Sequence, residues 1–217
     1  VPRSFDSDGT AYRSPAKEHW PNGNFSRDML IGYFAYLVQS PSQSLLATRF
    51  HDRVVDSGYL LCDNATDNRC DIGPVQYRVL WAIWGQIWDR MGLEKTFDME
   101  QADLGDDTIL SISAYGSPGF QLHLVGAELL LRRKLSTWTN KTSQAANTLR
   151  NRQPENPFFE YVAKGPTKRA AELTLKYCPR EKQYDSHQWS WQRADYEQAW
   201  KASMGWECIF MANLLNK

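Results

Sequence analysis

The chain has 217 residues, of which 42% are hydrophobic and 23% are charged. This size and composition suit one globular domain with a buried core, and we expect residues 1–217 to form a single helical domain with an extended N-terminal arm at 1–17. The 25 basic residues balance the 25 acidic ones, so the broad positive field that captures nucleic acid is missing. No run approaches the roughly 18 apolar residues of a membrane span. We therefore expect neither nucleic acid nor a membrane span.

The first expected elements are two helices. From Phe25 to Val38, apolar residues recur at three- and four-residue steps, as a helix requires. Asn24 or Ser26 can cap its start, and Asp28 complements the positive end of its dipole. A more polar helix follows at about 42–58, and the two make a helical hairpin.

The next helix is predicted from Pro74 to Met91 and carries Trp81, Trp84 and Trp88. It is apolar around most of its circumference, so it must be buried on several sides. A less regular stretch follows, in which 108–114 is the best candidate for a short strand.

A further, almost wholly apolar helix is predicted from Phe120 to Leu131. More polar helices are expected after it, at 142–152, 156–164 and 167–177. The last helix is expected from Tyr196 to Leu215. The chain is thus predicted to be all-α, with four inner helices surrounded by half-buried ones; the inner set is 28–38, 75–91, 119–131 and 202–215.

This alternation of fully buried and half-buried helices resembles the helical-hairpin (α/α) toroids that are common among glycoside hydrolases and polysaccharide lyases. The resemblance is one of architecture. A full six-hairpin toroid needs far more residues than this chain has, so the resemblance implies a shortened or incomplete ring. It also implies a glycan site lined by loops at the N-terminal ends of the inner helices.

The four cysteines favour disulfides. Cys62 and Cys70 bracket a polar loop, which is typical of a disulfide-closed loop, and Cys178 and Cys208 could pair across the fold. Sequence does not establish the connectivity of four cysteines. The alternative is a set of inert buried thiols in a cytosolic protein, where disulfides are rare. The histidines do not fall at zinc-ligand spacings, and we expect no metal and no cofactor.

Three N-x-[ST] sequons, at Asn24, Asn64 and Asn140, add to the case for export. Together with the cysteines they favour a secreted, lumenal or periplasmic glycoprotein. Asn64, within the proposed disulfide loop, is the favoured acceptor.

The segment 18–28 is the most function-like part of the chain. Helix N-termini present unpaired N–H groups and a positive dipole end, so polar side chains there can converge on an anionic or hydroxyl-rich ligand. We expect His19 and Asp28 to be catalytic candidates. The substrate-binding candidates are Trp20, Asn24 and Arg27. The alternative is a helix cap, in which Ser26 or Asn24 bonds the first-turn amides.

A second polar cluster lies at 184–195. Trp189 and Trp191 would offer a stacking platform for the face of a sugar ring. Planar polar groups that can bind its hydroxyls lie nearby: Asp185, His187 and Arg193. The alternative is that the indoles wedge this segment against the core, while the charged residues make structural ion pairs.

Polar residues also begin the two most apolar helices. His123 lies one turn into the 119–131 helix, and histidine is the side chain most able to exchange protons at neutral pH. The alternative is a hydrogen-bonded core histidine. Tyr77 and Arg78, two further substrate-binding candidates, stand at the start of the 75–91 helix. Four separated segments would then each bring polar groups to one end of the bundle.

If these segments form one site, two chemistries are open. Hydrolysis needs an acid and a base, usually two carboxylates, and the best pair is Asp28 with Asp185 or Asp195. β-Elimination needs a base, a tyrosine such as Tyr77, and an arginine or amide that neutralises a uronate. The candidate bases are His19, His123 and His187.

The commonest hydrolase, nucleotide and metalloprotease motifs, G-x-S-x-G, the P-loop, H-E-x-x-H and the Rossmann fingerprint, do not occur in the sequence. The leading hypothesis is a protein that acts on a glycan in a polar, Trp-lined site. The alternative is a non-enzymatic glycan-binding or protein-interaction module whose tryptophans are simply core. The residues leave open whether the protein is an enzyme, and they leave its oligomeric state open.

Overall fold

The computed structural model describes residues 5–6, 9–12, 16, 25–62, 69–103, 106–117, 119–178 and 205–216. Every named element within these ranges is a helix, so the chain is all-α, as its periodicity predicts. Two isolated β-bridges in the same ranges pair Phe5 with Ala11 and Leu60 with Asp71. No helix in the described part of the chain is long and apolar enough to cross a membrane.

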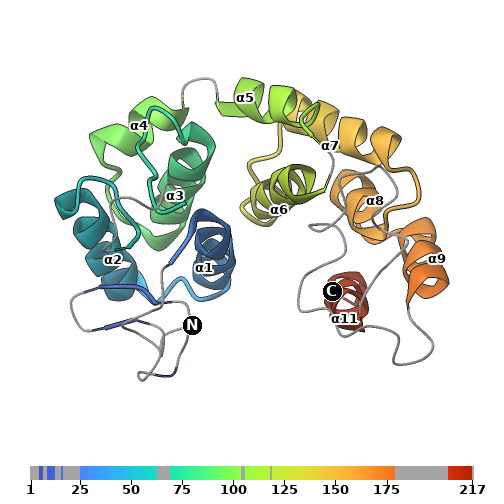
Figure 1. Ribbon diagram of the computed structural model, residues 1–217, viewed down its shortest axis with the longest axis horizontal. Coiled ribbons are helices and arrows are strands. Elements are labelled where there is room, and N and C mark those ends of the chain that lie inside the picture. Colours follow the sequence, from blue (N-terminus) through green and yellow to red (C-terminus); the bar gives the residue numbers. More distant parts are fainter. Residues whose placement is uncertain are drawn as a thin grey trace. The chain divides into compact units, whose positions relative to one another are not determined.

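The chain divides into two compact units (Figure 1). Unit 1 comprises Val1–Asp106 and Lys134–Thr137, and unit 2 comprises Asp107–Arg133 and Trp138–Lys217. The described helices of unit 1 are α1 (Arg27–Gln39), α2 (Ser44–Asp56), α3 (Arg78–Met91) and α4 (Phe97–Asp103). Those that lie wholly or mostly in unit 2 are α5 (Asp106–Ser113), α6 (Phe120–Lys134), α7 (Asn140–Arg152), α8 (Pro157–Lys164), α9 (Lys168–Tyr177) and α11 (Gly205–Leu215).

The core of unit 1 is aromatic. The Phe50 ring of α2 lies at its centre, with ring centroids 4.9 Å from Tyr33 and 5.5 Å from Trp84. Phe5 of the N-terminal arm reaches the same cluster, 5.4 Å from Phe50. Trp81 and Trp84 of α3 are fully buried. The apolar circumference of α3 is therefore explained by contacts with α1 on one side and with α4 on another.

The prediction of a short strand at 108–114 is wrong, because these residues belong to helix α5 and the turn that follows it. Leu110 and Ala114 are fully buried and lie one helical turn apart, whereas Ile112 is exposed. Arg152 of α7 donates hydrogen bonds to the carbonyl groups of Ala114, at 3.0 Å, and Gly116, at 2.7 Å. This long-range contact satisfies carbonyls at the helix end. A short run rich in isoleucine fits helix and strand patterns equally well, and tertiary contacts decided between them.

The short helices of unit 2 pack closely against one another. Asn156 caps α8 by accepting hydrogen bonds from the backbone N–H groups of Phe158, at 3.0 Å, and Phe159, at 3.3 Å. Gly126 lets α6 approach α8, since a Cβ atom there would lie 2.8 Å from the Phe158 ring. α7 contacts α8, α8 contacts α9, and α9 contacts α11.

Both cysteine pairs form disulfides, which settles the connectivity that the sequence left open. Cys62 pairs with Cys70, and Cys178 pairs with Cys208, each with a Cα–Cα distance of 5.6 Å. The second disulfide ties the end of α9 to α11. The predicted helix at 196–215 is described from Gly205 onward, and residues 196–204 lie outside the described ranges.

Candidate functional site

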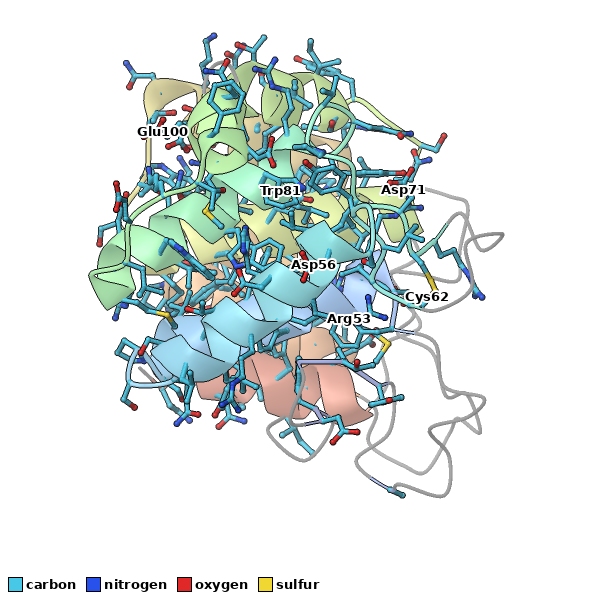
Figure 2. All side chains as sticks on the ribbon, turned by 90° about the vertical axis from the view of Figure 1, so that its left-hand side faces the viewer. Arg53, Asp56, Cys62, Asp71, Trp81 and Glu100 are labelled. Carbon is cyan, nitrogen blue, oxygen red and sulfur yellow. A yellow bond between two sulfur atoms is a disulfide. The ribbon has the colours of Figure 1, made fainter. Side chains whose placement is uncertain are left out.

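The start of α1 lies against the segment that closes the first disulfide loop. The backbone N–H of Arg27 donates to the carbonyl oxygen of Arg69 at 3.2 Å, and the Cys70 sulfur lies 3.5 Å from the carbonyl oxygen of Phe25. Figure 2 labels Cys62 and Asp71 in this part of unit 1. The disulfide therefore holds in place the chain that enters α1.

Arg27 and Tyr77 contact each other across this junction. The Arg27 guanidinium lies over the Tyr77 ring, 4.5 Å from its centroid, and donates a hydrogen bond to the Tyr77 hydroxyl. It also donates to the backbone carbonyl of Asp71, at 3.3 Å. Arg27 is the first residue of α1 and Tyr77 is the residue before α3. The contact therefore joins the N-terminal ends of two buried helices, and both residues were predicted to bind substrate.

Asp28 and Arg78 follow Arg27 and Tyr77 in the sequence, and we call the four residues Arg27, Asp28, Tyr77 and Arg78 the α1/α3 cluster. The contact of Arg27 with Tyr77 joins its two halves. The exposed Asp28 carboxylate accepts a hydrogen bond from the Ser26 hydroxyl. Ser26 occupies the N-cap position, and its backbone carbonyl accepts from the N–H of Met29 at 3.0 Å. Its side chain does not bond the first-turn amides, so the predicted cap by the Ser26 side chain is not formed. Arg78 donates to the carbonyl oxygen of Gln101 at 2.8 Å, which ties α3 to α4.

The α1/α3 cluster combines groups that suit a sugar. Its side chains are half-buried or exposed, so they are open to solvent. An aromatic ring can face pyranose C–H groups, and a guanidinium offers paired donors in a fixed plane. The N-terminal ends of α1 and α3 add positive potential near the cluster. The cluster can therefore bind hydroxyl or anionic groups.

His123 belongs to unit 2, on α6. Its ring centroid lies 5.6 Å from that of Phe158, and desolvation lowers its pKa to about 4. The imidazole is therefore neutral at pH 7. A neutral imidazole can accept a proton. It also fits the alternative that the sequence left open, a core histidine.

Eight predicted site residues lie outside the described ranges: His19, Trp20, Asn24, Asp185, His187, Trp189, Trp191 and Arg193. Of the five that are described, four form the α1/α3 cluster of unit 1 and His123 lies in unit 2. The predicted common site of all four segments stays a prediction.

Sequence reasoning missed Glu128 of α6. The carboxyl is half-buried, and no hydrogen bond or ion pair joins it to another described residue. Desolvation raises its pKa to about 8, so it is largely protonated at neutral pH. One signal was available, because Glu128 is the only acidic residue in the apolar run from 120 to 131.

Sequence reasoning also missed Asp71. Its carbonyl accepts from Arg27, and its carboxylate accepts from the Gly73 N–H at 2.8 Å. The D-I-G-P turn before α3 was the available signal. Within the described ranges, no group of three or more histidine, cysteine or carboxylate side chains is placed to hold a metal.

The likeness to helical-hairpin toroids rests on the pattern of helices. Comparison with models of known protein families, with curated proteins and with solved structures finds no match for the chain. The all-helical content agrees with the expected class, and the closure of the helices into a ring stays a prediction.

Proposed function

We propose that this protein binds a glycan at the α1/α3 cluster and acts on it by hydrolysis or β-elimination. The contact of Arg27 with Tyr77 carries the proposal. It stacks a planar cation on one face of a phenol ring. In this proposal the guanidinium gives a sugar paired hydrogen bonds and the opposite face of the ring gives it an apolar surface. Its place at two inner-helix starts agrees with the site that the toroid resemblance implies, here in a shortened ring.

In this proposal the residues of the α1/α3 cluster have different roles. Arg27 and Arg78 hold the substrate, and Arg27 would neutralise the carboxylate of a uronate in β-elimination. Asp28, with its exposed carboxylate, transfers the proton in hydrolysis. The partner acid or base would be His19, a predicted catalytic residue that belongs to unit 1 and lies outside the described ranges.

The two disulfides support a secreted, lumenal or periplasmic location, because disulfides persist in oxidising compartments. The sequons are consistent with a glycoprotein. These statements about compartment and modification are part of the proposal.

A non-enzymatic glycan-binding or protein-interaction module is the second candidate. The burial of Trp81, Trp84 and Trp88 favours it, since these indoles are explained by the core and need no ligand.

A panel of neutral and uronate-containing polysaccharides tests the proposal through binding and product release. Arg27→Ala should abolish binding, while Arg90→Ala, an exposed arginine at the other end of α3, should leave it unchanged. Arg27→Lys keeps the charge and loses the planar fork, so it should bind more weakly than wild type.

Turnover separates the two candidates. If the protein is a hydrolase, Asp28→Asn should bind but release no product, with Asp56→Asn of α2 as the matched exposed control. Binding without product from wild type would identify a binding module. Failure of wild type to bind any glycan on the panel would refute both the glycan-cleaving enzyme and the glycan-binding module, and would leave the protein-interaction module.

A further inference from the structure

Four aromatic rings form a continuous path through unit 1. Ring centroids are separated by 5.7 Å from Tyr59 to Trp81, by 5.1 Å from Trp81 to Trp84 and by 6.0 Å from Trp84 to Trp88. The three indoles lie three and four residues apart on α3, so one helix face carries them all. Trp81 and Trp84 are fully buried, and Tyr59 is half-buried at one end of the path. Figure 2 labels Trp81 within this path.

The indoles and the phenol differ in their proton acceptors. Trp81 Nε1 donates to the carbonyl oxygen of Ile72 at 2.5 Å, and a carbonyl group is no base at neutral pH. Trp84 Nε1 is buried and has no hydrogen-bond partner among the described residues. By contrast, the Tyr59 hydroxyl donates to Oδ2 of Asp98 at 3.0 Å, and a carboxylate can take a proton. Asp98 lies in the first turn of α4.

The backbone holds Tyr59 in an uncommon conformation. Gly58 and Tyr59 have φ angles of 72° and 69°, and the second is unusual for a residue with a side chain. Two backbone hydrogen bonds fix Tyr59, to Val54 at 2.8 Å and from Ile72 at 3.0 Å. Residues held in such conformations cluster at functional sites. Tyr59, the residue in this conformation, contacts both Trp81 and Asp98 through its side chain.

We propose that Tyr59 is a redox-active tyrosine at the end of an electron-hole path through Trp81, Trp84 and Trp88. A one-electron oxidant takes an electron from Trp88 or Trp84 and leaves an indole radical cation. Electrons from Trp81 and then Tyr59 restore the indoles, and the phenol proton moves to Oδ2 of Asp98. The products are the reduced oxidant, a neutral Tyr59 phenoxyl radical and a protonated Asp98. A thiol reductant returns a hydrogen atom to Tyr59 and becomes a thiyl radical, and Asp98 releases its proton to water.

The hole stops at Tyr59 because this ring is hydrogen-bonded to a carboxylate that can take its proton. The hydrogen bond to Asp98 also raises the pKa of Tyr59, so the phenol keeps its proton until it is oxidised. The path would carry oxidising equivalents out of the aromatic core. This activity is independent of glycan binding.

Pulse radiolysis with azide radicals, which oxidise indole in preference to phenol, tests the path in the full chain. In wild type we expect the indolyl absorption to decay as the phenoxyl absorption grows, at a rate independent of protein concentration. Tyr59→Phe should lose this phase. Tyr36→Phe, which removes a half-buried tyrosine of α1, should keep it.

Two further variants test the proton and the path separately. Asp98→Asn should slow the phase, because an amide cannot take the phenol proton, and Trp81→Phe should remove it while Tyr59 is intact. Near-UV circular dichroism checks that each variant is folded. If an aromatic variant does not fold, the rate of the phase in Asp98→Asn tests the proposal. A phase that survives in folded Tyr59→Phe, or that is unchanged in Asp98→Asn, would overturn the proposal.

Discussion

Arg150 of α7 and Glu160 of α8 form a partly buried ion pair, with Nε of Arg150 2.6 Å from Oε2 of Glu160. Arg169 of α9 lies near the same carboxylate oxygen, at 3.8 Å. One carboxylate, whose side chain is only 4% exposed, therefore connects three consecutive helices of unit 2.

We expect Arg150→Ala to lower the free energy of unfolding by about 3 kcal/mol, because it leaves the buried carboxylate without its close partner. The exposed pair of Lys168 and Glu172 is the control, and Lys168→Ala should cost less than about 0.5 kcal/mol. Denaturant unfolding measures both. Equal losses for the two variants would contradict a special role for Glu160.

Gly9 is expected to tolerate no side chain. Its φ is +94°, and a Cβ atom would lie 2.4 Å from the carbonyl oxygen of Arg49 in α2. Gly9→Ala should therefore detach the turn that brings Phe5 into the aromatic core, and lower the melting temperature. Gly92→Ala is the control, since Gly92 has a φ of +71° but open space around it. It should cost about 1 kcal/mol for the backbone conformation alone, and a smaller effect at Gly9 than at Gly92 would refute the clash.

The titration of Glu128 should make unit 2 less stable as the pH rises. Its pKa rises from 4.5 to about 8 on folding, so the unfolded chain releases this proton at lower pH than the folded one. The free energy of unfolding should therefore fall as pH rises from about 4.5 to about 8. Glu128→Gln should flatten this decline, as measured by denaturant unfolding across the range. An unchanged profile would show that the carboxyl titrates normally.

The titration of His123 should make the protein less stable as the pH falls. Its pKa falls from 6.5 to about 4 on folding, so the unfolded chain binds this proton first as the solution is acidified. Stability should be lost as pH falls from 6.5 to about 4. His123→Gln should remove that part of the acid sensitivity. Nuclear magnetic resonance of the imidazole provides a direct check, and a titration near 6.5 in the folded protein would contradict the prediction.

Local patterns determined much of the fold. The three- and four-residue spacing of apolar residues was sufficient to predict the helices that became α1, α2, α3 and α6, because each of these helices buries a continuous face. Gly92 ends α3 in the left-handed conformation, as its place after the apolar run indicates. The closeness of Cys62 to Cys70 in sequence likewise predicted their pairing.

Tertiary contacts decided the features that local patterns did not predict. The isoleucine-rich run at 108–114 became helix α5 and the turn after it, with Arg152, distant in sequence, at its C-terminal end. The contact of Arg27 with Tyr77 joins residues 50 positions apart, and the raised pKa of Glu128 comes from desolvation by its surroundings. A local sequence window records spacing and residue type. It holds no information about which distant group will lie against a side chain, and that neighbour sets both the contact and the charge state.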